Sequence, residues 1–141
     1  MKRHALSIVS LLTLVLMGSA LAQTNQVRAD VPFSFSVGST ALPAGAYDVT
    51  SIGGDSHTLL IKARDGSANA IVNSNSAIRM DGAEKTKLVF HRYGSQYFLA
   101  EVWRQGSTSG NQFPKSSREK ELGKELAMGH ADRVEIVARL Y

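Results

Sequence analysis

The feature that most constrains the fold is an alternation of apolar and polar residues with a period of two. Its first clear instance sets an apolar face against a face of serine and proline: Val31, Phe33, Phe35 and Val37 against Pro32, Ser34 and Ser36. A period of two with aromatic and β-branched side chains is typical of a half-buried β-strand. Because Pro32 cannot donate a ladder hydrogen bond, we expect this strand to begin there or to lie at a sheet edge.

The clearest hairpin lies in the middle of the chain. Residues 85–93 and 96–104 both have strand character, and Gly94-Ser95 joins them. In the second arm the two faces are expected to carry Tyr97, Leu99 and Trp103 on one side and Phe98, Ala100 and Val102 on the other. Strands that are apolar on both faces are typical of the centre of a covered sheet. We therefore expect this pair to organise the core.

Further strands are predicted between turn-forming residues: 46–52, 58–63, 68–73 and 133–141. The Asp65-Gly66 pair between two of them suits a type I′ hairpin turn. The stretch 23–30 is taken as a polar lead-in, and the polar stretch 73–76 has no clear assignment. Residues 105–115 are rich in Gly, Ser and Asn, which predicts a loop.

One helix is predicted between this loop and the last strand. Ser116 or Ser117 can cap its first turn, and Ser116 with Glu119 fits a capping box, in which each side chain satisfies the backbone amide of the other residue. The helix is expected to run to about Met128, with Gly129 as its C-terminal stop.

These elements predict a mainly β fold with about seven strands and one late helix. Short strands with a turn roughly every 8–12 residues are typical of an antiparallel β-sandwich or a small β-barrel. The stretch 23–141 is long enough for a single domain with one core, and we expect the helix to cover one end or one sheet edge.

The stretch 1–22 is predicted to be a secretory signal peptide. Lys2 and Arg3 form a basic start, 5–17 is an uncharged apolar run, and Ala20-Leu21-Ala22 offers the small residues of a cleavage site. The alternative is a membrane anchor, but the apolar run is shorter than the roughly 20 residues that span a bilayer. We expect an exported protein, periplasmic or extracellular, whose mature chain does not span a membrane.

Charge and cysteine content exclude several classes of function. Without Lys2 and Arg3 the mature chain has 14 basic and 12 acidic side chains, which gives no electrostatic case for binding nucleic acid. The chain has no cysteine. In an exported protein this excludes disulfides, thiol catalysis and a lipidated N-terminal cysteine.

No motif predicts a metal, a cofactor or a catalytic residue. The histidines of the mature chain, His57, His91 and His130, have no metal-ligand spacing. Ser117-x-x-Lys120 matches the S-x-x-K pattern of penicillin-recognising enzymes, but their other motifs are missing, and helix capping explains these serines equally well.

The candidate ligand-binding residues lie in the central hairpin: Tyr93, Tyr97, Glu101 and Trp103. Glu101 is the informative member because it interrupts an apolar strand. If it faces a cavity, burial raises its pKa and marks a site. If it faces solvent, it forms an ion pair across the hairpin with Lys85 or Lys87. We favour the ion pair, and core packing for the aromatic side chains.

Three segments carry a family resemblance: 31–38 (VPFSFSVG), 42–47 (LPAGAY) and 88–99 (LVFHRYGSQYFL), followed by Trp103. They resemble those of a family of small, uncharacterised exported bacterial proteins. The resemblance spans most of the mature chain and implies a compact exported β-domain. It assigns no activity and no functional residue.

The preferred hypothesis is a non-catalytic exported β-domain that binds a partner or contributes to the cell envelope. A second hypothesis is a carrier of a lipid or aromatic ligand, with Tyr97, Glu101 and Trp103 on the wall of an apolar cavity. A hydrolase, which depends on the S-x-x-K match alone, ranks last.

Overall fold

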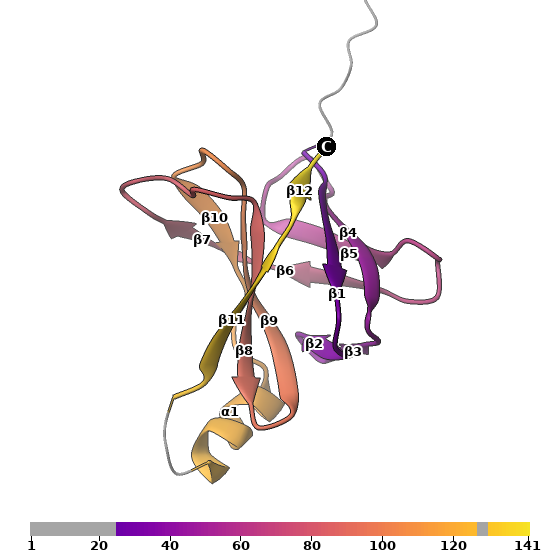
Figure 1. Ribbon diagram of the computed structural model, residues 1–141, viewed down its shortest axis with the longest axis vertical. Coiled ribbons are helices and arrows are strands. Elements are labelled where there is room, and N and C mark those ends of the chain that lie inside the picture. The colour runs from indigo at the N-terminus through magenta and orange to yellow at the C-terminus, as the bar shows by residue number, and fades with distance from the viewer. Residues whose placement is uncertain (1–24, 127–129) are drawn as a thin grey trace, which may run out of the picture.

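The computed structural model describes residues 25–126 and 130–141. Within these ranges, twelve strands form two sheets, and one helix precedes the last two strands (Figure 1). The predicted signal peptide, residues 1–22, and the predicted helix end at 128–129 lie outside the described residues. None of the helical structure in the described ranges has the length and hydropathy needed to cross a membrane.

The first sheet, sheet A, is antiparallel and has the strand order β12-β1-β4-β5-β6. Its strands are β1 (Val27–Val31), β4 (Gly45–Ser51), β5 (Thr58–Ala63), β6 (Asn69–Asn73) and β12 (Arg139–Leu140). The predicted strands 46–52, 58–63 and 68–73 match β4, β5 and β6 to within one residue at each end.

The second sheet, sheet B, has the order β11-β8-β9-β10-β7. Its strands are β7 (Asn75–Ile78), β8 (Lys87–Tyr93), β9 (Gln96–Trp103), β10 (Ser109–Gln112) and β11 (Asp132–Val137). A short hairpin of β2 (Phe35–Val37) and β3 (Thr40–Leu42) joins this sheet through a parallel pairing of β2 with β9. The predicted central hairpin, β8 and β9, is confirmed.

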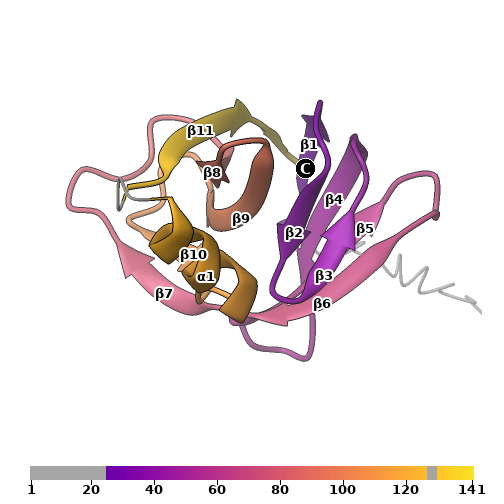
Figure 2. The same ribbon diagram turned by 90° about the horizontal axis from the view of Figure 1, so that it is seen from below.

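Two bends link the sheets at their sides. The chain passes from β6 in sheet A to β7 in sheet B at Ser74 (Figure 2), and from β11 back to β12 at Ala138 (Figure 1). Ser74 is buried and donates both its backbone N–H and its hydroxyl to the carbonyl of His57. Strands that change sheets through bends are typical of a sandwich. The described residues form such a sandwich rather than a closed barrel, so the predicted mainly β fold is confirmed.

The core between the sheets is filled by large side chains. Tyr47 and Phe90 are fully buried, and the Tyr47 hydroxyl donates to the carbonyl of Pro43 at 2.6 Å. The ring of Phe35 packs edge-on against both of these rings, with centroids 5.1 and 5.3 Å apart. Such pairs add to the stabilisation from buried area.

The first predicted strand, 31–37, is divided in the structure. β1 ends at Val31 and β2 begins at Phe35, because Pro32 interrupts the ladder between them. β1 instead begins in the predicted lead-in, where Val27 and Ala29 alternate with Arg28 and are buried. The alternation therefore begins four residues earlier than predicted.

Three strands lie where none was predicted: β3, β7 and β10. β7 overlaps the unassigned polar stretch 73–76 at Asn75 and Ser76 and continues to Ile78, and β10 lies within the predicted loop 105–115. They pair with each other from Ser109 opposite Ile78 to Gln112 opposite Asn75. β10 is polar, and β7 has only Ala77 and an exposed Ile78 as apolar residues, so backbone pairing rather than an apolar pattern defines them.

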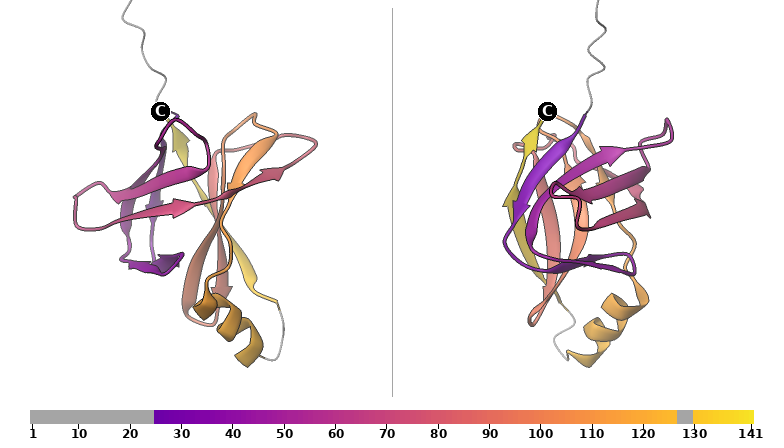
Figure 3. Two further views of the ribbon diagram at one scale, coloured as in Figure 1. Left: turned by 180° about the vertical axis from the view of Figure 1, so that it is seen from behind. Right: turned by 90° about the vertical axis from the view of Figure 1, so that its right-hand side faces the viewer.

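The helix α1 (Ser117–Glu125) begins where it was predicted. Ser116 is its N-cap, and the Ser116 hydroxyl accepts the backbone N–H of Glu119 at 3.2 Å. Only this half of the capping box forms, because the Glu119 carboxylate points to sheet B instead. Leu122 packs on Tyr93 and Phe98, which holds α1 against one end of the sheet (Figure 3).

Candidate functional site

A β-bulge in β9 determines where the candidate ligand-binding residues lie. Phe90 pairs with Leu99, but the preceding residue, Val89, pairs with Glu101, so Ala100 is the extra residue. An extra residue reverses the alternation of the strand beyond it. Tyr97 therefore packs against the core between the sheets, whereas Glu101 and Trp103 lie on the outer face of sheet B.

Tyr97 occupies a packed position. Its ring stacks on that of Phe33 with centroids 3.7 Å apart and an angle of 14° between the planes. The predicted grouping of Tyr97 with Glu101 and Trp103 on one wall is thus not found, since these residues lie on opposite faces of sheet B.

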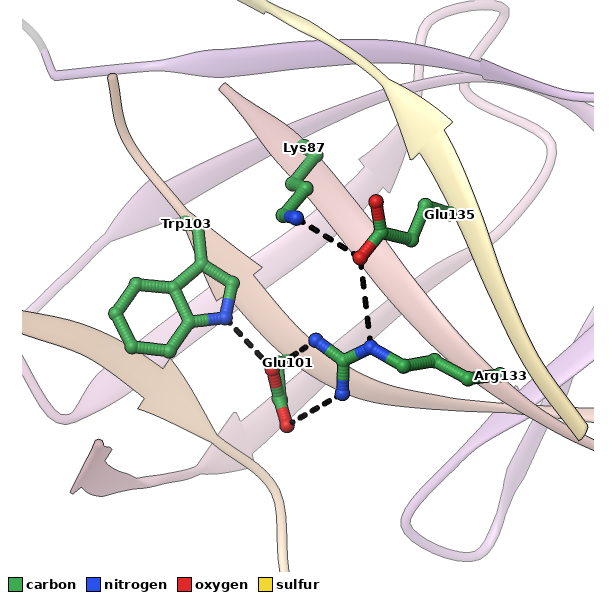
Figure 4. Close-up of polar contacts among 5 residues, drawn as sticks. All are labelled: Lys87, Glu101, Trp103, Arg133 and Glu135. Carbon is green, nitrogen blue, oxygen red and sulfur yellow. Dashed lines mark hydrogen bonds and ion pairs between the residues drawn. The ribbon is translucent and has the colours of Figure 1, made fainter. Parts of the chain in front are cut away.

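Glu101 and Trp103 belong to a group of five polar side chains, which we call the charged network (Figure 4). The Trp103 Nε1–H donates to Glu101 Oε2 at 2.6 Å. Arg133 donates to both Glu101 oxygens, at 3.2 and 3.1 Å. Glu135 accepts from Lys87 Nζ at 2.8 Å and from Arg133 Nε at 3.4 Å. All charges in the network are therefore paired.

The charged network keeps Glu101 ionised. Burial raises the pKa of this carboxyl, but the hydrogen bonds from Arg133 and Trp103, together with the charge of Arg133, lower it below its usual value. The predicted ion pair forms, with Arg133 of β11 as the partner instead of Lys85 or Lys87. Arg133 reaches across β8 because its strand partner, His91, lies diagonally opposite Glu101.

Trp103 is packed on the sheet and does not line a cavity. It is 3% exposed and contacts Ala83 and Val89. A Cβ atom at Gly110 would lie 2.7 Å from a carbon of the indole ring, so only glycine allows this close approach. The indole of Trp103 lies flat against Gly110 and is held beside Glu101 by the hydrogen bond to that carboxylate.

The fourth candidate, Tyr93, lies on the same outer face but at the α1 end of the sheet. Its hydroxyl donates to Glu119 Oε1 at 3.1 Å, and His91 Nδ1 lies 2.8 Å from the same oxygen. Burial, the charge of Glu119 and this hydrogen bond raise the pKa of Tyr93 to about 12. The group fastens α1 to sheet B through a carboxylate that is 5% exposed.

The geometry gives little support for catalysis. A carboxylate on histidine Nδ1 is the orienting part of a catalytic triad, but within the described residues no serine or threonine hydroxyl bonds to His91. Ser117 and Lys120 are both exposed on α1, with no hydrogen bond between them. Residues 25–126 and 130–141 contain no group of acidic and histidine side chains placed to hold a metal ion.

Four surface hollows have volumes between about 200 and 460 Å³, and none of the four is lined by Tyr93, Tyr97, Glu101 or Trp103. Arg104 lines the hollow of about 200 Å³, and sequence reasoning missed it. Its pocket is built from several separate segments, so no local pattern marks it. Arg133 and Glu135 were also missed, although their alternation in 133–141 places them on one strand face.

Comparison with known proteins gives no relative: no family model matches the chain, and no match was found among curated proteins or solved structures. The resemblance of the three segments to exported bacterial proteins therefore stays a prediction.

Proposed function

We propose that this chain is an exported, non-catalytic β-domain that works by binding a partner outside the cytoplasm. Support for export comes from the order of basic, apolar and small residues in 1–22. Support for a stable domain in that compartment comes from a well-filled core that needs no disulfide.

The observation that carries the non-catalytic part is the bonding of Glu101. A general acid near neutral pH needs a raised pKa, whereas the pKa of Glu101 is lowered by Arg133 and Trp103. The buried carboxylate of Glu119 bonds to His91 and Tyr93 and holds α1 against sheet B. Both groups stabilise the fold.

The charged network supports binding through the outer face of sheet B. Arg133 and Glu135 are 46% and 44% exposed, yet hydrogen bonds fix both side chains. Exposed groups that are already ordered lose little entropy when a partner docks. A face with both signs of charge suits a protein partner with complementary charges.

The packing disfavours the carrier hypothesis. The space between the sheets holds Tyr47, Phe90 and other fully buried side chains, so a lipid would have to displace them. Trp103 lies outside this core, so its fluorescence reports on the charged network rather than on the interior.

The proposal is tested by native mass spectrometry of the protein purified from its own host. We expect a chain that begins at Gln23 and that carries a bound protein subunit. Arg133→Ala should release the subunit, whereas Arg118→Ala, an exposed arginine on α1, should retain it. Retention of Met1 would contradict export. Turnover of ester, glycoside or peptide substrates that is lost in Ser117→Ala would contradict a non-catalytic role.

A further inference from the structure

Arg104 lies between the two sheets at the end of the sandwich opposite α1. It follows β9 two residues after Val102, which faces the core, so it points inward while Trp103 points outward. There it lines a pocket of about 200 Å³ with serines from separate elements, including Ser51 and Ser76. We call this the serine pocket; its lining also includes Ser56 and Asn111.

The guanidinium of Arg104 is only partly bonded. Its Nη1 donates to Asn111 Oδ1 at 3.0 Å. Its Nε and Nη2 are shielded from solvent, and neither has a hydrogen-bond partner among the described residues. No acidic side chain lines the pocket, and burial lowers the pKa of Arg104 without any opposing contribution from a carboxylate.

Asn111 holds the guanidinium in place. The Asn111 amide donates to the carbonyl of Ser56 at 2.6 Å and to the hydroxyl of Ser74 at 2.9 Å. Both amide hydrogens are thereby used, so Oδ1 faces Arg104. Ser74 in turn donates to the carbonyl of His57 at 2.9 Å. This chain of bonds orients Arg104 without neutralising its charge.

A shielded cation with unused donors is costly, because it has left water without gaining a partner. The unused donors are adjacent: Nε and Nη2 lie on the same edge of the planar group. This edge is the one that binds two oxygens of an anion at once. The guanidinium therefore lacks a counter-charge, and an anion can contact Nε and Nη2 only after a small shift of the side chain.

We propose that the serine pocket binds a tetrahedral oxyanion, a phosphate or sulfate group, through the guanidinium of Arg104, whose side chain shifts to turn Nε and Nη2 toward the pocket. Ser51, Ser56 and Ser76 come from different segments of the chain and can donate to further oxygens, which a planar carboxylate lacks. The volume is below the roughly 300–1,000 Å³ of sites for drug-sized molecules. The pocket therefore takes a free anion or the anionic end of a larger molecule. This site is independent of any partner on the charged network.

The test is the melting temperature of the purified protein in chloride, phosphate, sulfate and acetate at matched ionic strength. A tenfold excess of phosphate over its Kd multiplies the folded-to-unfolded ratio about elevenfold and raises Tm by about 3–6 °C. Phosphate or sulfate should stabilise the protein, acetate less so, and calorimetric titration should give one site. Equal melting temperatures in all four salts would overturn the proposal.

Variants assign the effect to the pocket. Arg104→Met should abolish the stabilisation by phosphate. Arg104→Lys keeps the charge but loses the paired donors, and should lower the affinity for phosphate at least tenfold. Arg118→Met removes one exposed arginine on α1 and should keep the full effect. If Arg104→Met does not fold, Arg104→Lys and the titration of the unaltered protein decide. Phosphate stabilisation that persists in both Arg104 variants would refute the site.

The source of the anion is distinguished by comparing inorganic phosphate, glycerol 3-phosphate and vesicles of phosphatidic acid. Stronger stabilisation by glycerol 3-phosphate than by inorganic phosphate identifies a phosphomonoester as the ligand. Co-sedimentation with the vesicles that Arg104→Met abolishes identifies a lipid headgroup. A vesicle interaction that Arg104→Met leaves unchanged, without any effect of the soluble anions, would contradict the proposal.

Discussion

Arg133 and Arg104 both project from sheet B, yet their surroundings are opposite. Arg133 is 46% exposed and donates to two carboxylates, Glu101 and Glu135. Arg104 lies in the serine pocket, is more shielded, and has no carboxylate beside it among the described residues. Arg133 thus has counter-charges although water already screens it. Arg104 has none although screening in the pocket is weak.

This difference separates stability from binding. Every charged side chain of the charged network has a partner of opposite charge. Removing one member therefore leaves its partner unpaired and destabilises the fold. The Arg104 group is incomplete, so removing the arginine in a buffer without phosphate or sulfate should destabilise little. The two arginines are therefore expected to respond in opposite ways to substitution and to added anions.

Removal of Trp103 should have the largest effect on the charged network. Trp103→Ala deletes a buried ring and one donor to Glu101, so we expect a loss of about 3–5 kcal/mol in the free energy of unfolding. Urea denaturation measures it. Trp103→Phe keeps most of the packing and should lose less than half as much. If the free energy of unfolding falls by less than about 1 kcal/mol in both variants, Trp103 does not stabilise the outer face of sheet B.

Glu101→Gln should have the next largest effect. It removes the charge that Arg133 binds bidentately, and we expect a loss of about 1–3 kcal/mol near neutral pH. Because the folded pKa of Glu101 is lowered, its contribution is present above its ordinary pKa of about 4.3 and is lost as the pH falls through the lower folded value. The variant should therefore lose less stability than the unaltered protein as pH falls below about 4.

Adding an acidic side chain to the serine pocket should mimic the ligand. Ser76→Asp places a carboxylate in the pocket that Arg104 lines. In chloride buffer we expect a gain of about 1 kcal/mol and a loss of the response to phosphate. Ser76→Asn is the matched variant without charge and should keep that response. A destabilised Ser76→Asp protein that still responds to phosphate would argue against an anion beside Arg104.

The smallest effect in the charged network is expected at Lys87. Lys87 pairs with Glu135, whose carboxylate is 44% exposed and also bonds Arg133. Lys87→Met should therefore change the free energy of unfolding by less than about 1 kcal/mol. A larger loss in thermal or urea unfolding would show that Lys87 contributes more than a screened surface pair.

Much of the sheet structure could be predicted because apolar alternation reports burial directly. Leu88 and Phe90, and the strands that pair with them, follow that pattern. β7 and β10 could not be predicted, since Gly110 and its neighbours are defined by the indole above them and by backbone pairing. Pro32 predicted the start of a strand or a sheet edge, whereas the structure has a break between β1 and β2 there. The earlier start at Val27 was hidden among polar residues.

The candidate site was only partly predictable because one extra residue in a strand reverses which of the following side chains point to the core and which point outward. Ala100 has no sequence feature that marks a bulge, yet it separates Tyr97 from Glu101. The ion pair of Glu101 was predicted in kind, but its partner comes from a strand 32 residues away in sequence. The serine pocket depends on loops and strands meeting at one end, which single-chain patterns do not show.

The most direct test of the account compares Arg104→Met with Arg133→Met in one chloride buffer free of phosphate, sulfate and carboxylates. We predict that Arg133→Met lowers the free energy of unfolding by about 1–3 kcal/mol, because Glu101 loses its counter-charge. We predict that Arg104→Met leaves it unchanged or raises it. An Arg104→Met protein that is destabilised as much as Arg133→Met would contradict the account.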